Sequence, residues 1–311
     1  MTPFSPEKLV IFDYSGTLSL EAPRFARPVN LLSALAESGL AKLGVATPEA
    51  FWGEIVGPTW TRGSTTAIGY KRVMAERITA LALDPGAAGA EITAASSRFV
   101  DLYLAHSRID ARWRTILAEL ANDPATAVVI ATDHYAEATE AIVRHLDSLD
   151  IRAQKADKWA ESIAHAGDRS GTPSGPGRRN GGGKATDSSG TPQGGREDFS
   201  SFAIANSADI GFWKADRRFW DALRLNLSRE KVRSLLMIDD FGFNEEQGDA
   251  YAERAKVEAR REKTRGVLWE AFQTPMEVIT FFLEGAERNP DGDAGRQIEE
   301  TSRSIRSFLK K

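Results

Sequence analysis

Three short apolar runs, each followed by a helical pattern, constrain the fold of this chain more than any other feature of its sequence. They are LVIF, AVVIA and SLLMI, at residues 9–12, 127–131 and 234–238. Polar residues bound each run, which is typical of strands that are buried on both faces of a parallel sheet. Strands that alternate with helices predict an α/β fold, a doubly wound parallel sheet with crossover connections.

Two weaker apolar segments, FAIA at residues 202–205 and GVLWEAF at residues 266–272, are interpreted as further strands. Together with the three strong runs, they predict a Rossmann-like core made of residues 1–18 and 123–285. Residues 286–311 are expected to form a C-terminal loop followed by a helix that docks on this core, since their apolar residues recur at helical spacing.

The segment between the first two strong runs is helical in pattern and too long for an ordinary crossover. Thr47 is expected to cap a helix that starts at Pro48. Residues 19–122 are therefore predicted to form an inserted helical cap domain. The helix that follows the cap block, from about residue 110 to residue 121, is expected to return the chain to the sheet.

A segment rich in Gly, Ser, Pro and Thr occupies residues 167–196 of the expected core. With almost no apolar residues, it cannot bury enough surface to offset the entropy of ordering, so we expect a flexible low-complexity insertion. Its GGGK sequence does not fit a phosphate-binding loop, because Ala185 follows Lys184 and no apolar strand leads into it.

The composition excludes several classes of function. The 311 residues carry a net charge of −4 with a pI near 5.8, which predicts neither a nucleic-acid nor a membrane partner. The chain has no cysteine, so disulfides, thiolate metal sites and cysteine nucleophiles are absent. No apolar run approaches the ~18 residues of a membrane span. We expect a cytoplasmic protein that acts on a small molecule; its oligomeric state is left open.

Each of the three strong runs ends in a polar residue that can bond or carry charge. Asp13 follows the first, Thr132 the second, and Asp239 and Asp240 the third. Ligands of doubly wound sheets bind at the carboxyl ends of the strands, so these side chains predict a common site. The alternative is that the strands simply return to solvent, where Asp and Thr are common.

Four segments resemble, in order, the four motifs of the haloacid dehalogenase superfamily: IFDYSGTLS, VVIATDHYAEAT, GFWKADRRFWDAL and LLMIDDFGFNEEQGDA. In this resemblance Asp13 is the nucleophile, and Thr132 and Lys214 contact the phosphoryl group. The third motif departs from the family pattern, since Ala215 and Arg217 stand where prolines are usual. Lys155 and Lys158 are alternatives for Lys214 that lack the surrounding pattern.

The resemblance implies Mg²⁺ as the cofactor, held by Asp13, the backbone carbonyl of Ser15 and Asp240, with Asp239 in support. These are the oxygen ligands that Mg²⁺ prefers. Asn244 and Glu245 are either part of the metal shell or only the start of a helix.

Further residues are candidates for contact with the substrate. Gly16 and Thr17 belong to the first motif, and Arg62 and Lys71 of the cap, beside aromatic residues, could recognise an anionic or planar group. The alternative for the cap pair is an ordinary solvated surface. His134 follows Thr132 and either reaches the mouth of the site or lies on a surface helix.

Ser15 is the main departure from the phosphatases of the family, which usually carry a second Asp there as general acid and base. A serine hydroxyl is a poor substitute for that role. The leading hypothesis is a Mg²⁺-dependent phosphatase of a small phosphorylated metabolite that acts through an aspartyl-phosphate. The alternatives are a hydrolase of carbon–halogen or carbon–phosphorus bonds and a catalytically weakened binding or regulatory protein.

Overall fold

The fold was analysed in a computed structural model, which describes residues 6–157, 201–226, 232–245, 253–283 and 290–311. The low-complexity segment at residues 167–196 and Lys158 lie outside the described residues.

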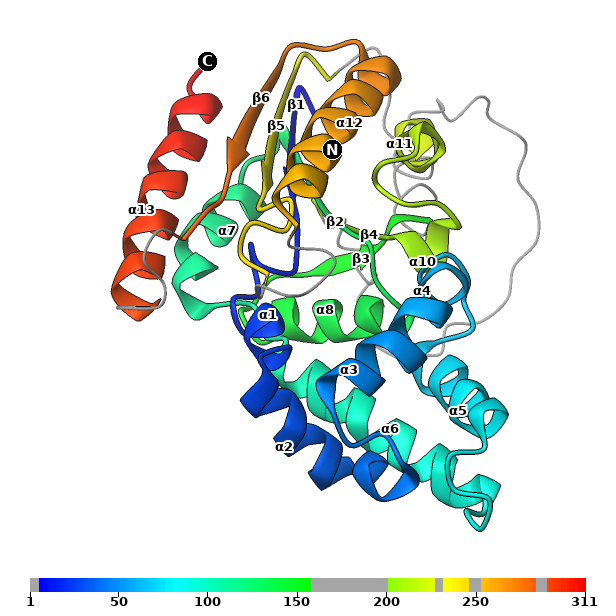
Figure 1. Cartoon of the computed structure of the whole chain (residues 1–311). Helices are drawn as coiled ribbons and strands as arrows, with labels where there is room; N and C mark the ends of the chain where they lie inside the picture. Colours follow the sequence, from blue (N-terminus) through cyan, green and yellow to red (C-terminus); the bar gives the residue numbers. More distant parts are fainter. Residues whose placement is uncertain (1–5, 158–200, 227–231, 246–252, 284–289) are drawn as a thin grey trace, which may run out of the picture.

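A six-stranded parallel sheet forms the centre of the molecule (Figure 1). Its strand order is β3-β4-β2-β1-β5-β6, so the first strand of the chain lies inside the sheet. The α/β fold expected from the apolar runs is thus confirmed, and so is the weaker strand at residues 202–205. The strands are β1 (Lys8–Phe12), β2 (Thr126–Thr132), β3 (Ala153–Lys155), β4 (Phe202–Asn206), β5 (Ser234–Asp239) and β6 (Met276–Thr280).

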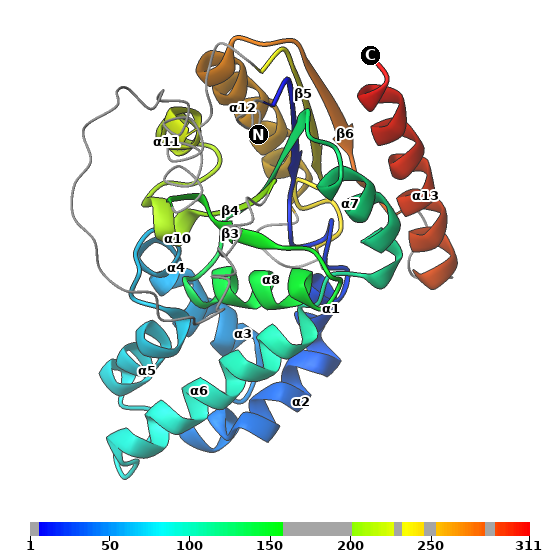
Figure 2. The ribbon, with the colours of Figure 1, turned by 180° about the vertical axis from the view of Figure 1, so that it is seen from behind.

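Helices cover both faces of the sheet, as Figures 1 and 2 show from opposite sides. One face is covered by α7 (Arg114–Ala121), α8 (Glu137–Asp147) and α13 (Pro290–Leu309). The other is covered by α11 (Arg217–Asn226) and α12 (Arg254–Phe272), while the short α10 (Ser207–Ile210) follows β4.

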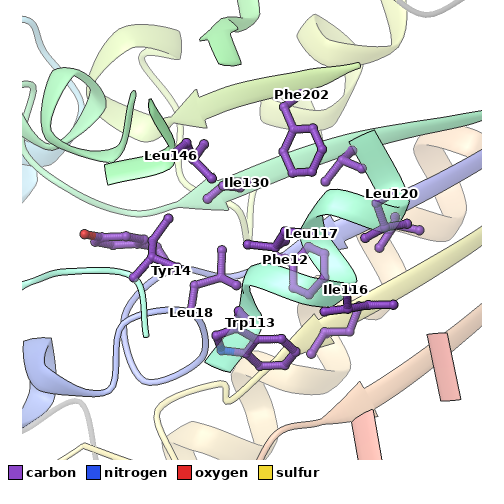
Figure 3. Packing of buried hydrophobic residues seen from close by; sticks show 14 of the residues in the cluster. Phe12, Tyr14, Leu18, Trp113, Ile116, Leu117, Leu120, Ile130, Leu146 and Phe202 are labelled. Atoms are coloured by element: carbon purple, nitrogen blue, oxygen red, sulfur yellow. The ribbon is translucent and has the colours of Figure 1, made fainter. Parts of the chain in front are cut away.

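The two-sided burial explains why the strands are continuously apolar. Val10 and Phe12 point into the core on the α7 side, and Leu9 and Ile11 point into the core on the α12 side. Figure 3 shows the first of these cores, in which Phe12 lies against Trp113 with ring centroids 5.8 Å apart. Successive residues of a strand point to opposite faces, and both faces are buried here, so every position of the strand needs to be apolar.

A second group of helices is inserted between β1 and β2 and lies below the sheet in Figure 1. These helices have an apolar core of their own, built around Leu35, Phe51, Met74 and Phe99. The inserted helices are α1 (Glu21–Phe25), α2 (Pro28–Ser38), a 3-10 helix (Leu40–Leu43), α3 (Pro48–Ala50), a π-helical segment (Phe51–Val56), α4 (Gly57–Ser64), α5 (Tyr70–Leu81) and α6 (Gly89–His106).

Helix α7 packs on the sheet and not among the inserted helices. Its residues Ile116, Leu117 and Leu120 share the apolar core of Val10 and Phe12. The helix expected from about residue 110 to residue 121, which returns the chain to the sheet, is thus confirmed, although the boundary at residue 122 counted it with the cap. A helix that covers a strand at short range in this way is an ordinary part of a crossover.

The strand expected at residues 266–272 is wrong, because this segment forms the end of helix α12. Only Leu268, Ala271 and Phe272 are buried in it, at helical spacing, and Trp269 between them is exposed. The helix expected at the C-terminus is confirmed. Its residues Ile298, Ile305 and Phe308 are buried against the α7 side of the sheet.

Thr47 accepts a hydrogen bond from the backbone N–H of Ala50 at 3.2 Å, which confirms the expected helix cap. A search of the described helices finds none with the length and apolar character needed to cross a membrane.

Candidate active site

The register of the sheet brings the polar strand ends together. Phe12 of β1 pairs with Ile130 of β2 on one side and with Ile238 of β5 on the other. Asp13, Thr132 and Asp239 therefore leave the sheet at neighbouring points of its carboxyl edge. The backbone N–H of Asp13 donates to the carbonyl of Ile238 at 2.8 Å, which holds the β1 exit against β5.

Lys214 lies between two of the carboxylates. Its Nζ donates to Asp13 Oδ1 at 2.5 Å and to Asp239 Oδ2 at 2.9 Å. The backbone N–H of Lys214 donates to Asp133 Oδ1 at 2.8 Å, and its carbonyl accepts from Trp220 Nε1 at 2.7 Å. The lysine is thus anchored at its backbone and buried to 7% exposure, a position that an ordinary solvated lysine does not take.

Asp240 is held by the turn that follows β5. Its carboxylate accepts from the backbone N–H groups of Gly242 and Asn244, at 3.1 and 3.0 Å. Gly16 lies directly against this carboxylate. With φ at +76°, a Cβ at Gly16 would lie 2.3 Å from Asp240 Oδ2, so the close approach of the two loops requires glycine.

Thr17 and Asn244 hold the same loops by their side chains. Thr17 Oγ1 accepts from the backbone N–H of Asp240 at 3.0 Å. The side-chain amide of Asn244 donates to the carbonyls of Gly16 and Phe281, at 2.8 and 2.9 Å. Gly16, Thr17 and Asn244 therefore position Asp240 and are not among the residues that line the cavity described below.

Ser15 faces Glu245, which the sequence left undecided between the metal shell and a helix start. The Ser15 hydroxyl donates to Glu245 Oε1 at 3.2 Å, and both residues line the cavity at the site. Position 15 carries no carboxylate of its own, but the Glu245 carboxylate, from a distant part of the chain, lies next to it.

Burial dominates the electrostatics of the carboxylates. Desolvation raises the pKa of Asp13 to about 7, with Asp239 adding to the rise and Lys214 opposing it. Desolvation also raises the pKa of Asp240 well above its ordinary value, with the charges of Asp13 and Glu245 adding to the effect. One lysine does not compensate three buried acids.

A divalent cation fits this cluster. Asp13, Asp239 and Asp240 each offer a carboxylate oxygen within 4.8 Å of the others, and all three are buried. Asp239 is already bonded to Lys214 and, through Oδ1, to the backbone N–H of Phe241 at 2.6 Å. Asp13 is bonded to the same lysine, and the Asp240 carboxylate accepts from two backbone N–H groups, so all three acids have hydrogen-bond partners and all three remain candidate ligands.

Two candidate substrate contacts are not brought to the site. Arg62 lies in an exposed ion pair with Glu76 at 2.8 Å, and Lys71 pairs with Asp101 at 2.6 Å. Neither residue lines the cavity. Lys155, the alternative to Lys214, pairs with Glu140 at 2.9 Å and does not line it either.

A cavity of about 690 Å³ extends from the acidic cluster to the inserted helices. Asp133, His134 and Tyr103 line it, and the sequence did not single out Asp133 or Tyr103. The signal for Asp133 was its place one residue after Thr132 at the end of β2. No sequence signal marks Tyr103, since it lies in the middle of α6.

His134 is buried and neutral. Its Nδ1 accepts from the backbone N–H of Tyr135 at 2.8 Å, so the proton of the neutral ring lies on Nε2, which bonds to the Tyr103 hydroxyl oxygen at 2.7 Å. Desolvation lowers the pKa of His134 from 6.5 to about 4. The residue lies at the cavity and not on a surface helix, which resolves the alternative left by the sequence.

The lowered pKa of His134 predicts a loss of stability in mild acid. The unfolded chain binds a proton at this residue below about pH 6.5 and the folded chain only near pH 4, so the contribution is complete above pH 6.5 and is lost as the pH falls toward 4. At pH 5 the loss amounts to about 2 kcal/mol. His134→Asn keeps an acceptor for the Tyr135 N–H but has no group that titrates in this range, so this variant should not show the part of the stability loss that comes from His134.

Urea unfolding of the wild type and His134→Asn at about pH 7.5 and pH 5 measures this difference. The gap in the free energy of unfolding between the two proteins should narrow at the lower pH. An unchanged gap would show that His134 is not held neutral by burial.

Comparisons with known proteins give limited similarity. No protein-family model and no curated protein sequence matches the chain. Two solved structures are similar to it. A 2-haloacid dehalogenase from Pseudomonas syringae pv. tomato is 19% identical, with a TM-score of 0.42, over 75% of this chain and 77% of that one. The HAD-hydrolase YfnB from Bacillus subtilis, solved with bound magnesium, is 12% identical, with a TM-score of 0.36, over 76% and 78%.

Proposed function

We propose that this chain is a hydrolase of the haloacid dehalogenase type and, more specifically, a Mg²⁺-dependent phosphatase of a small organic phosphate that acts through an aspartyl-phosphate on Asp13. The proposal starts from the four motifs in the sequence. It gains its main support from one observation, the contact of Lys214 Nζ with both Asp13 and Asp239 at the carboxyl edge of the sheet.

Each residue of the site has a task in this reaction. Asp13 attacks phosphorus through a carboxylate oxygen, which splits one difficult displacement into two. Lys214 and the Thr132 hydroxyl donate hydrogen bonds to the phosphoryl oxygens, whose charge shifts in the transition state. Water then attacks the aspartyl-phosphate, releases phosphate and restores the Asp13 carboxylate.

Asp13, Asp240 and the Ser15 carbonyl would hold the Mg²⁺ ion. When bound, the ion would neutralise the uncompensated carboxylates, lower their pKa values and offset the charge of the phosphoryl oxygens. The raised pKa of Asp13, about 7, supports this view. A nucleophilic carboxylate has to be ionised, and Lys214 alone leaves its pKa high.

A hydrolase of carbon–halogen bonds is the second candidate, and Ser15 is the observation that favours it. Such a reaction expels halide, which needs no proton from a general acid. The three buried acids of the cluster weigh against this candidate, because an Asp nucleophile that works without a metal has no use for the uncompensated carboxyl of Asp240 beside it.

The test is product release with and without metal. Purified protein is assayed with Mg²⁺ or with EDTA on acetyl phosphate, an aryl phosphate and 2-chloropropionate. We expect phosphate release with Mg²⁺, its loss in EDTA and its recovery when Mg²⁺ is added back. Mg²⁺ should also raise the melting temperature, because it binds only the folded cluster. Halide release in EDTA, without phosphate release in Mg²⁺, would overturn the proposal in favour of the second candidate.

A further inference from the structure

The cavity has two ends of opposite chemistry. At the sheet, its lining carries the charged side chains, which come from Asp13, Asp133, Lys214, Asp239, Asp240, Glu245 and Arg260. The inserted helices, which the structure describes completely, contribute no charged side chain to the lining. Their contribution is mainly aromatic and aliphatic, and consists of Ala22, Phe25, Ala26, Leu31, Phe51, Trp52, Gly53, Val56, Gly57, Trp60, Tyr70, Phe99 and Tyr103.

Aromatic rings at this end of the cavity pack against one another and against Tyr135, which follows β2 and also lines the cavity. Tyr70 and Tyr135 are stacked with centroids 3.8 Å apart, and Trp60 meets Tyr135 edge to face at 5.4 Å. Phe99 contacts Phe51 at 4.9 Å. Since the rings constrain one another, the walls are formed before a ligand enters, which lowers the entropic cost of binding.

The inserted helices are also fixed to the core on this side. The Glu137 carboxylate accepts from the backbone N–H groups of Tyr70 and Lys71, at 2.7 and 3.1 Å. Trp213 Nε1 donates to Ser64 Oγ at 2.9 Å, and Ser207 Oγ donates to the carbonyl of Ser64 at 2.6 Å. In this structure, these hydrogen bonds connect the aromatic end of the cavity to the part of the chain that carries the acidic cluster.

The aromatic end of the cavity discriminates against polar substrates. A sugar or a nucleoside carries several hydroxyl or amide groups, and each loses its hydrogen bonds to water when it is buried against rings that offer few partners. An aromatic ring makes no such hydrogen bonds to water, so its burial costs none of them, and the hydrophobic effect and ring–ring contact favour its binding. The volume of about 690 Å³ is within the ordinary range for a bound organic molecule.

Ser15 points to the same class of substrate by independent chemistry. Its hydroxyl is bonded to Glu245, and in the proposed phosphatase Ser15 itself supplies no carboxylic acid to protonate the leaving oxygen. An alkoxide leaves poorly without that proton, whereas a phenolate is far more stable, since a phenol has a pKa near ~10. An aryl phosphate would thus suit both the aromatic end and the serine.

We propose that the substrate is an aryl phosphate ester, whose ring occupies the aromatic end while its phosphoryl group lies at Asp13. This proposal rests on the proposed phosphatase activity. In the first step an Asp13 oxygen forms a bond to phosphorus, and the bond from phosphorus to the aryl oxygen breaks, so that the phenolate leaves with the bonding electron pair and takes a proton from solvent. In the second step water adds to phosphorus, the bond to Asp13 breaks, and one water proton passes to solvent.

The experiment compares kcat/KM for four phosphates in the presence of Mg²⁺. 1-Naphthyl phosphate has an aromatic leaving group, and acetyl phosphate has a better leaving group but nothing to fill the aromatic end. Glucose 6-phosphate and glycerol 3-phosphate are polar. We expect 1-naphthyl phosphate to exceed the two polar esters by roughly 10²-fold or more and acetyl phosphate by roughly tenfold, since pocket contacts of this kind reach such ratios.

Two matched variants test whether the aromatic end causes the preference for 1-naphthyl phosphate. Val56→Asn places an amide in the lining, whereas Val29→Asn makes the same change on α2 at a position that is 72% exposed and outside the cavity. In Val56→Asn the ratio of kcat/KM for 1-naphthyl phosphate to that for acetyl phosphate should fall by about tenfold. In Val29→Asn the ratio should stay at its wild-type value.

Binding of 1-naphthyl phosphonate, followed by tryptophan fluorescence, gives a readout that needs no turnover. We expect saturable binding that Val56→Asn weakens and Val29→Asn does not. Polar esters turned over as fast as 1-naphthyl phosphate would overturn the substrate class and leave the phosphatase standing. The absence of phosphate release from every compound would overturn the phosphatase and this reaction with it. If Val56→Asn and Val29→Asn bound the phosphonate equally well, the proposal that the ring binds at the aromatic end would be wrong.

Discussion

Asp13→Asn is expected to lower phosphate release by at least ~10³-fold, as the loss of a nucleophile does in other covalent catalysts. The amide nearly keeps the shape of the side chain but removes the charge that attacks phosphorus. The fold should survive, because the change removes one negative charge from a buried cluster in which three acids surround one lysine. Phosphate release, circular dichroism and the melting temperature without metal measure the two effects.

Asp150→Asn is the matched control for this prediction. Asp150 has an exposed carboxylate paired with Arg114, and its φ of +63° is one that Asn also accepts. This variant should keep the wild-type rate. If Asp13→Asn stayed active while folded, Asp13 would not be the nucleophile, and the assignment of the site would fail.

Ser15→Asp, combined with Glu245→Gln, is expected to raise the hydrolysis of an alkyl phosphate by about 10²-fold, at the lower end of what general acid–base catalysis contributes. The second change is needed because the Ser15 hydroxyl lies 3.2 Å from Glu245 Oε1. A new carboxylate there would meet another one and repel it. An aryl phosphate should gain less, since its leaving group needs little protonation.

The single variants separate the two contributions. Glu245→Gln alone adds no acid and should not accelerate alkyl phosphates, and Ser15→Asp alone should gain less than the double variant. A fall in activity toward every phosphate, with the fold preserved, would mean that Ser15 serves a different reaction. That outcome would favour the carbon–halogen candidate.

The packing of the strands explains why the sheet was predictable. A strand buried on both faces has to be apolar at every position, so residues 9–12, 127–131 and 234–238 carry a dense local signal. The segment at residues 266–272 carried a similar signal and is helical. Short apolar runs do not distinguish a strand from a buried helix face, and here the packing of α12 on the sheet decided between them.

The core of the site was also accessible from the sequence. Asp13 and Asp240 follow strands directly, and Thr132 and Asp239 are the last residues of theirs. Because parallel strands end at one edge of a sheet, strand order and local pattern suffice to bring these four residues together. Lys214 follows no strand. It was found only through its resemblance to a family motif, and its place depends on hydrogen bonds to Asp133 and Trp220.

The sequence by itself determined the parallel sheet, the insertion of helices after β1 and the acids at the strand ends. Each of these features produces a pattern among residues that are close together in the sequence. Only the tertiary structure decided that Ser15 faces Glu245, that Arg62 and Lys71 turn away into surface ion pairs, and that an aromatic wall faces the acids. The reason is physical. Helical periodicity shows which face of a helix is apolar, but whether that face fills a core or lines a cavity depends on how distant helices pack against one another.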